Sequence, residues 1–118
     1  MEYLTPQEEE AMLLVWRLGK GFIKDIHELY PEPRQPYTTL ASTVKNLERK
    51  GYVSSRRYGN ACEYAPAVCE KEYKKQFVSG FVKDFFSDSY SELVTFFAQE
   101  QRISADELKK IISIIEKQ

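Results

Sequence analysis

The central part of the sequence combines a helical pattern with two extended stretches that follow it at once. Apolar side chains in this region recur at i, i+4 and i+7, which is the spacing of one helix face. They are Leu40, Val44 and Leu47. Gly51 follows the pattern, and the stretches Tyr52–Tyr58 and Ala61–Ala65 are joined only by Gly59-Asn60, a link typical of a tight β-hairpin. The sequence therefore predicts a helix over 37–50 that runs directly into a β-hairpin.

Two shorter helices are predicted before this segment. Thr5, with Glu8 three residues later, forms the capping box that begins a helix over 6–18, and Gly19 and Gly21 are expected to end it in left-handed backbone angles. Apolar residues then recur at helical spacing and predict a second helix, which prolines end. These apolar residues are Phe22, Ile23, Ile26 and Leu29, and the prolines are Pro31 and Pro33.

The last part of the sequence is predicted to be a tail of three helices. Aromatic residues recur every four positions from Tyr73 to Phe85, and apolar residues around Leu93 indicate a further helix. Ser104 with Glu107 forms a second capping box, which begins the last helix.

Aromatic residues are concentrated in this tail, which holds eight of the sixteen in the chain. Three helices in so short a segment cannot bury that much apolar surface among themselves. We expect a second copy of the chain to cover it, the alternative being that the tail folds back onto the rest of its own chain. The predicted fold is therefore mainly α with a small β-hairpin, divided into a domain at 1–69 and a helical dimerisation domain at 70–118. The predicted dimerisation residues are Phe77, Phe81, Phe85, Leu93, Val94, Phe97, Leu108, Ile111, Ile112 and Ile115.

Positive charge is concentrated in one short block, although the whole chain carries a net charge of only −1. Residues 34–59 contain six basic groups and one acidic group, a net charge of +5, whereas residues 1–33 and 60–118 carry −4 and −2. A basic block between acidic flanks is expected of a surface that faces a polyanion, and a solvated basic face is the alternative.

The residue types argue against most other classes of function. The sequence lacks the motifs of nucleophilic hydrolases and phosphate-binding loops, and its single histidine, His27, has no visible catalytic partner. Cys62 and Cys69 do not supply the four ligands of a closed zinc site, and so few cysteines suit a reducing cytoplasm. The longest apolar run, Ala11–Trp16, is far shorter than the ~20 residues that cross a bilayer. The sequence predicts a cytoplasmic protein that is not an enzyme and has no cofactor, no metal and no membrane contact.

The outward positions of the predicted helix over 37–50 are suited to reading DNA. Short hydroxyls, an amide and cations lie away from the apolar stripe, and a helix of about 10 Å diameter fits the major groove. Threonines at the helix start can donate to phosphate with help from the helix dipole, or present methyl groups to thymine. The predicted phosphate contacts are Thr38, Thr39, Lys45, Arg49 and Lys50, and the predicted base readers are Ser42, Thr43 and Asn46.

The predicted hairpin adds further candidates for contact with DNA. Arg56 and Arg57 alternate along a strand, so one of them is expected to face the DNA and the other to point away. Tyr58 and Asn60 lie at the tip, where they are expected to reach phosphate or the minor groove.

Several motifs together resemble the penicillinase-repressor family of winged-helix transcriptional regulators. Thr38-Thr39-Leu40 is similar to that family's T-T-V, and Leu47–Val53 (LERKGYV) to its L-x-K-K-G-hydrophobic motif. Tyr64 resembles the family's wing tyrosine, and Glu9–Trp16 its E-x-x-V-M-x-x-x-W helix. The similarity spans essentially the whole chain, the tail included.

The resemblance implies a winged helix-turn-helix domain in a bacterial homodimer that binds a pseudopalindromic operator and represses antibiotic-resistance genes. It also implies induction by a sensor protease that cuts the tail at an Asn-Phe pair, which aligns here with Phe96 and Phe97, the candidate cleavage region. Asn46 stands where the family has a groove-facing arginine. The alternative hypothesis is a winged-helix protein-interaction module whose aromatic tail grips a partner helix.

Overall fold

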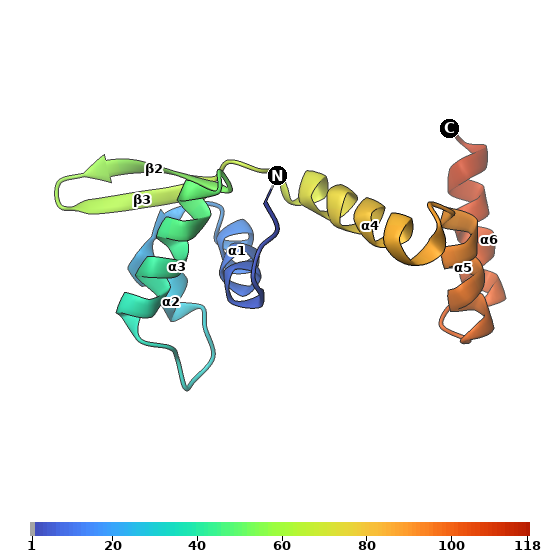
Figure 1. The fold of residues 1–118 in the computed structure, drawn as a ribbon, viewed down its shortest axis with the longest axis horizontal. Coiled ribbons are helices and arrows are strands. Elements are labelled where there is room, and N and C mark those ends of the chain that lie inside the picture. The colour runs from blue at the N-terminus through green and yellow to red at the C-terminus, as the bar shows by residue number, and fades with distance from the viewer. Residues whose placement is uncertain (1) are drawn as a thin grey trace. The chain divides into compact units, whose positions relative to one another are not determined.

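Residues 2–118 are described by a computed structural model, in which the chain forms two compact units. The first unit ends at Tyr73, and the second is Lys74–Gln118. The elements of the first are α1 (Pro6–Leu18), β1 (Gly21–Phe22), α2 (Ile23–Glu28), α3 (Tyr37–Arg49), β2 (Val53–Tyr58) and β3 (Ala61–Pro66) (Figure 1). They are followed by α4 (Glu70–Phe86), α5 (Tyr90–Gln99) and α6 (Ala105–Glu116). The fold is mainly helical with a small sheet, which confirms the predicted class.

The first helix, α1, is capped at both ends as the sequence predicts. The Thr5 hydroxyl accepts a hydrogen bond from the Glu8 amide at 3.2 Å, and the Glu8 carboxylate accepts one from the Thr5 amide at 2.9 Å. Gly19 ends the helix with a φ of 87°, in the left-handed region. Gly21 does not have the predicted positive φ, and a Cβ there would lie 2.5 Å from Leu18 Cδ2. Close packing against Leu18 and Asp25, not a left-handed turn, therefore favours glycine at this second position.

A two-residue strand stands where the sequence predicts the start of the second helix. Phe22 pairs with Glu63, so β1 lies beside β3, and α2 begins one residue later at Ile23. The Asp25 carboxylate accepts a hydrogen bond from the Phe22 amide at 2.9 Å, which caps α2. The prediction is wrong at this point because two residues are too few to show strand alternation, and Phe22 fits the helical spacing equally well.

The sheet is antiparallel, with strand order β1-β3-β2. Tyr58 pairs with Ala61 across Gly59-Asn60, which confirms the predicted two-residue hairpin between β2 and β3. Val53 and Tyr64 are buried on the inner face of the sheet.

One hydrophobic core lies within the first unit. Leu40, Val44 and Leu47 of α3 are each 0% exposed, which confirms the apolar stripe predicted for that helix. Helix α1 packs against the opposite side of this core. At the edge of the core, Trp16 donates a hydrogen bond from Nε1 to the Val68 carbonyl at 2.8 Å. The other core residues are Ala11, Met12, Leu14, Val15, Ile23, Ile26, Tyr30, Tyr52, Val53 and Tyr64.

The second unit has the three predicted helices but almost no interior. Val82 is its one buried side chain among the described residues, and α5 and α6 contribute none. Of the sixteen exposed large hydrophobic side chains in residues 2–118, twelve belong to this unit. They are Phe77, Val78, Phe81, Phe85, Tyr90, Val94, Phe96, Phe97, Ile111, Ile112, Ile114 and Ile115. Across residues 2–118, no helix is both long and apolar enough to span a membrane.

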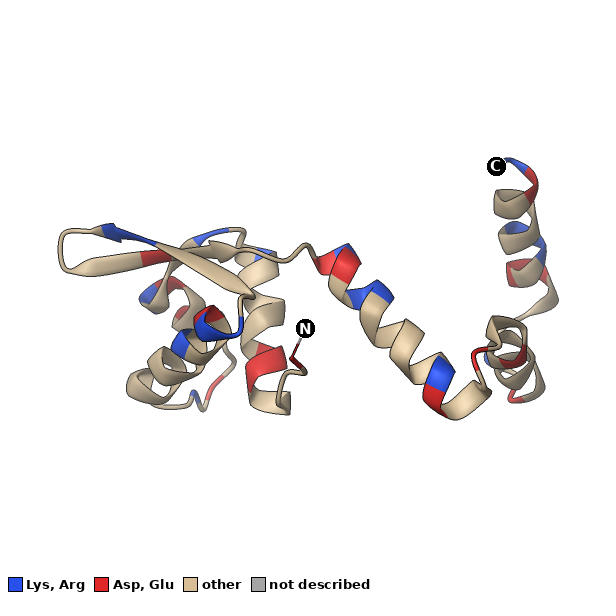
Figure 2. Cartoon of the chain, turned by 45° about the horizontal axis from the view of Figure 1, so that its top comes forward, with Lys and Arg blue, Asp and Glu red and all other residues tan. Residues whose placement is uncertain are grey.

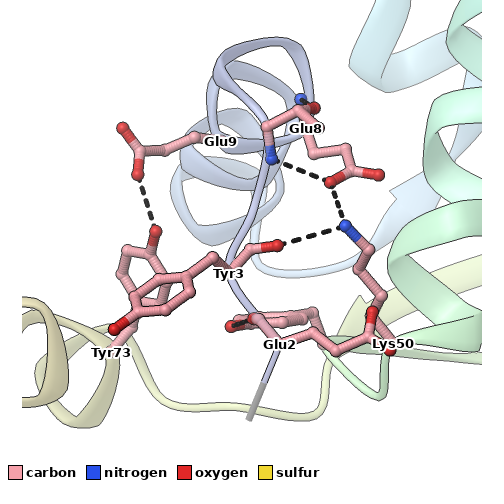
Figure 3. A network of polar contacts seen from close by, with 8 residues as sticks. Glu2, Tyr3, Glu8, Glu9, Lys50 and Tyr73 are labelled. Atoms are coloured by element: carbon pink, nitrogen blue, oxygen red, sulfur yellow. Dashed lines mark hydrogen bonds and ion pairs between the residues drawn. The ribbon is translucent and has the colours of Figure 1, made fainter.

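A polar network ties the N-terminal segment to the end of α3 (Figure 3). The Lys50 ammonium donates to the Glu8 carboxylate at 2.6 Å and to the Tyr3 carbonyl at 3.1 Å. Both side chains of the ion pair are nearly buried, at 11% exposure for Lys50 and 7% for Glu8. The pair therefore fixes the C-terminal end of α3 against the start of α1.

Tyr73 holds the first turn of α4 on the first unit. Its hydroxyl donates to the Glu9 carboxylate at 2.6 Å (Figure 3), and its ring contacts those of Trp16 and Tyr52. Burial, together with the bond to Glu9, raises the pKa of the Tyr73 phenol. These contacts explain why the first compact unit extends to Tyr73, past the boundary at residue 69 that the sequence suggested.

Replacing Lys50 by methionine is expected to destabilise the protein by about 2 kcal/mol, because the Glu8 carboxylate loses its counter-ion in a nearly buried place. Burial raises the pKa of Glu8, but hydrogen bonds and charge from Lys50 and Thr5 outweigh it, so the folded-state pKa is lowered. The stability that the pair provides is present above the unfolded-state pKa and is lost as the pH falls through the lowered one. Urea unfolding should therefore show a smaller difference between K50M and the original protein in acid than at neutral pH.

The matched control is Lys45→Met, which removes an exposed ammonium from the same helix. Its unfolding free energy should stay within about 0.5 kcal/mol of the original. Equal losses in the two variants would contradict a specific role for the pair of Glu8 and Lys50.

Candidate nucleic-acid interface

Five of the predicted contact residues share the exposed side of α3. The buried apolar stripe fixes the rotation of this helix about its axis, so the opposite side faces solvent. The exposed residues are Thr38, Ser42, Lys45, Asn46 and Arg49, with Thr39 half-buried beside them. Hydroxyl, amide, ammonium and guanidinium groups are thus brought together on one helix face.

The start of α3 supplies backbone donors as well. Pro36 is the N-cap and makes no side-chain hydrogen bond to the helix, while its carbonyl accepts from the amides of Thr39 and Leu40 at 3.1 and 3.2 Å. The first amides of a helix have no acceptor within it, and the helix dipole makes this end attractive to anions. The exposed Thr38 side chain lies at this positive end.

Thr43 and Lys50 do not lie on the exposed face, which corrects the sequence prediction for both. Thr43 is 6% exposed, and its hydroxyl donates to the Thr39 carbonyl at 3.0 Å, as short hydroxyl side chains inside helices do. The Lys50 ammonium is directed to Glu8 and the N-terminal segment. Thr43 lies three residues after Leu40 and four before Leu47, so helical spacing puts it on the apolar face, and the prediction failed because it followed the residue's polarity. For Lys50, no local pattern shows that it packs inward.

The two arginines of the hairpin lie on opposite faces of the sheet, as strand alternation predicts. Arg57 is on the face that turns toward α3, because Ser55 two residues earlier donates a hydrogen bond to the Glu48 carboxylate of that helix. Arg56 is on the other face, with its guanidinium carbon 5.3 Å from the centroid of the Tyr58 ring. Arg57 is therefore the arginine that shares a side with α3.

The hairpin tip exposes both of its predicted contact residues, Tyr58 and Asn60. Gly59 adopts a φ of 58°, and its carbonyl accepts a hydrogen bond from Arg57 Nε at 3.0 Å. The Tyr58 ring meets the Phe22 ring edge-on, with 6.2 Å between centroids. These contacts order the tip.

The basic block of the sequence is only partly available at the surface. Arg34 is exposed but pairs with Glu32 at 3.1 Å and donates to two backbone carbonyls, and Lys50 is nearly buried in its pair with Glu8. The other four cations of residues 34–59 are exposed, and Figure 2 shows basic segments on α3 and along the hairpin. They are Lys45, Arg49, Arg56 and Arg57.

The pattern that defines the penicillinase repressor family matches residues 4–117. The chain belongs to the penicillinase repressor family. Members of this family are transcriptional repressors.

Two relatives match almost the whole chain. The methicillin resistance regulatory protein MecI of Staphylococcus aureus is 20% identical over 115 residues, which are 97% of this chain and 94% of that protein. The penicillinase repressor of Bacillus licheniformis is 21% identical over 114 residues, which are 96% and 89% of the two chains.

Solved structures show a similar fold. The ligand-free organohalide-sensing transcriptional regulator RdhR-CbdbA1625 matches with a TM-score of 0.50 and 10% identity, over 97% of this chain and 61% of that one. At such low identity the likeness shows the winged-helix type of fold and nothing more.

Glu48 is a site residue that sequence reasoning missed. Its carboxylate receives the Ser55 hydroxyl and so joins α3 to the hairpin. It is the one acidic residue in the block 34–59, and its presence among basic residues was the sequence signal that could have indicated a structural role.

Replacing Thr43 by valine should leave the affinity for DNA unchanged within about twofold, because this buried side chain cannot reach a base. Ser42→Ala, on the exposed face next to it, is the matched comparison and should weaken binding about fivefold by removing one hydrogen bond. Fluorescence anisotropy with a duplex selected by the protein from genomic fragments measures both. A larger loss for T43V than for S42A would show that Thr43 does contact DNA.

Proposed function

We propose that the protein is a dimeric, sequence-specific DNA-binding repressor, with α3 in the major groove and the hairpin of β2 and β3 on the DNA backbone. The observation that carries this proposal is the joint exposure of Asn46, Arg49 and Arg57 on the side shared by α3 and the hairpin. Membership of a repressor family supports it. The names of the two relatives support genes for antibiotic resistance as the regulated targets.

The exposed side chains divide into two kinds of contact. Asn46 can form the two hydrogen bonds with adenine that discriminate it from other bases by about 1–3 kcal/mol. Lys45 and Arg49 carry full charges near that position and suit phosphates on either side. Arg57 extends the same cationic surface onto the hairpin. We infer that base reading rests on the middle of α3 and affinity on the cations around it.

Replacing Arg49 by alanine should flatten the slope of log affinity against log salt by about 0.9, because each neutralised phosphate releases its counterions. The affinity should fall for the selected duplex and for a random duplex alike. Anisotropy titrations at several salt concentrations measure both the slope and the loss.

Two comparisons make this test specific. Arg102→Ala removes an exposed arginine from the second unit and should leave the slope unchanged. Asn46→Ala should keep the slope but change the sequences that a new selection recovers. If the original protein does not bind DNA at low salt, or if its binding to DNA does not weaken as salt rises, the protein-interaction hypothesis is favoured instead.

The exposed apolar side chains of the second unit support a homodimer. This unit buries one side chain, Val82, among its described residues, and a unit of that size without a core is not stable in water alone. Its exposed residues include eight of the ten predicted dimerisation residues, whereas Leu93 and Leu108 are half-buried. A two-fold dimer would present two copies of α3 to half-sites about 34–36 Å apart, as a pseudopalindromic operator requires.

Replacing Phe85 by alanine should weaken dimerisation at least tenfold, because this ring is 73% exposed in the single chain and contributes apolar area to the proposed interface. Sedimentation equilibrium over a range of concentrations measures the dimer dissociation constant. Leu13→Ala, at an exposed leucine of the first unit, is the matched control and should leave that constant unchanged. A protein that is monomeric at tens of micromolar would overturn the dimer.

The candidate cleavage region lies inside a helix. Phe96 and Phe97 are in α5, and the Phe96 ring packs on Phe86 with 5.7 Å between centroids. A protease binds its substrate extended, so the proposed sensor protease could cut here only where α5 unwinds. Cleavage would separate α6 from α4 and so remove isoleucine side chains from the proposed interface.

A further inference from the structure

A small groove lies between α3 and the hairpin tip, inside the first unit. Its volume is about 330 Å³, which falls in the range of small-ligand sites. Tyr37 and Lys45 line it from α3, Phe22 from β1, and Asn60 and Cys62 from the hairpin. The groove therefore opens on the same face that the proposed function assigns to DNA.

The lining of this groove combines aromatic rings with positive charge. Among the described residues that line it, Lys45 is the one charged side chain, and none is acidic. Tyr37 and Tyr64 supply aromatic surface, Tyr64 from the same sheet face as Cys62. Arg57 is directly opposite Cys62 in the strand register and on the same sheet face, which brings a second cation beside the groove.

We propose that this groove binds a small aromatic carboxylate, with the carboxylate paired to Lys45 and the ring packed against the aromatic lining. A backbone phosphate of DNA could use the cation but would leave the rings of Tyr37 and Tyr64 without an apolar partner. An uncharged aromatic molecule would use the rings but would leave the cation unpaired. An aromatic carboxylate satisfies both parts of the lining.

A ligand in this groove would interfere with DNA binding, and this consequence rests on the proposed function. Lys45 is one of the exposed cations assigned to DNA phosphate, so a carboxylate that pairs with it removes that contact. A ring held between α3 and the hairpin tip also occupies space that faces the DNA backbone. Ligand and DNA therefore compete, and the ligand acts as an inducer of the repressed genes.

Protection of Cys62 from alkylation tests the site without any DNA. Cys62 lines the groove and is half-buried, whereas Cys69 is an exposed free thiol outside it and serves as an internal control. Naphthalene-2-carboxylate is the probe, with naphthalene-2-carboxamide as its uncharged match. We expect the carboxylate to slow the reaction of iodoacetamide at Cys62 with half-protection at about 1 mM or below, and to leave Cys69 unchanged. Peptide mass spectrometry resolves the two thiols.

Lys45→Met tests the role of the cation. The substitution keeps the aliphatic stem, and it should raise the half-protecting concentration at least tenfold, to the value that the carboxamide gives with the original protein. Lys20→Met, at an exposed lysine that does not line the groove, should leave the concentration unchanged. Absence of protection at about 10 mM, equal protection by the carboxamide, or equal protection in K45M would each overturn the proposal.

Competition with DNA separates this inference from the proposed function. Naphthalene-2-carboxylate should reduce the apparent affinity for the selected duplex in proportion to its occupancy at Cys62. Protection of Cys62 together with unchanged DNA affinity would reject the inducer role. DNA binding without protection would reject the groove as a ligand site and leave the repressor standing, whereas protection without any DNA binding would reject the repressor and leave the ligand site.

Discussion

The rotation of α3 about its own axis is the constraint on which the proposed interface depends. Leu40, Val44 and Leu47 are fully buried, and turning the helix by one residue would expose part of this stripe and bury charged groups. Burial of three large aliphatic side chains stabilises this orientation by several kcal/mol, at about 1.5–3 kcal/mol each. Asn46 and Arg49 face outward because the apolar side of the same helix has a core to fill.

Polar contacts then fix the C-terminal end of the helix and join it to the hairpin. The pair of Lys50 and Glu8 holds the C-terminal end, and the bond from Ser55 to Glu48 joins the helix to β2. Outside these contacts, Lys50 would add to the positive charge offered to DNA, and Glu48 would reduce it. The interface is therefore less basic than the block 34–59, because two of that block's six cations, Arg34 and Lys50, are paired within the first unit.

The two units differ in how they use apolar residues. The first places them inside, where the core includes Met12, Ile26 and Tyr52. The second leaves rings and isoleucines on its surface, although its helices carry regular caps such as the Ser104 and Glu107 capping box. Capping and helical periodicity make helices in either unit, but only the packing of helices against other elements makes a core. The second unit therefore has secondary structure without a complete tertiary structure of its own, which is the physical basis for proposing a second copy.

The sequence by itself determined the helices, the hairpin and the buried stripe of α3, because apolar periodicity, capping residues and the Gly59-Asn60 link act over a few neighbouring residues. It also placed Ser42, Asn46 and Arg49 on the face opposite that stripe. Only the tertiary structure decided that Lys50 turns inward, that β1 joins the sheet, and that Arg57 shares a side with α3. Lys50 and Phe22 depend on partners far away in the sequence, Glu8 and Glu63, and the side of Arg57 depends on the bond between Ser55 and Glu48. No local pattern encodes which residue of another element a side chain will meet.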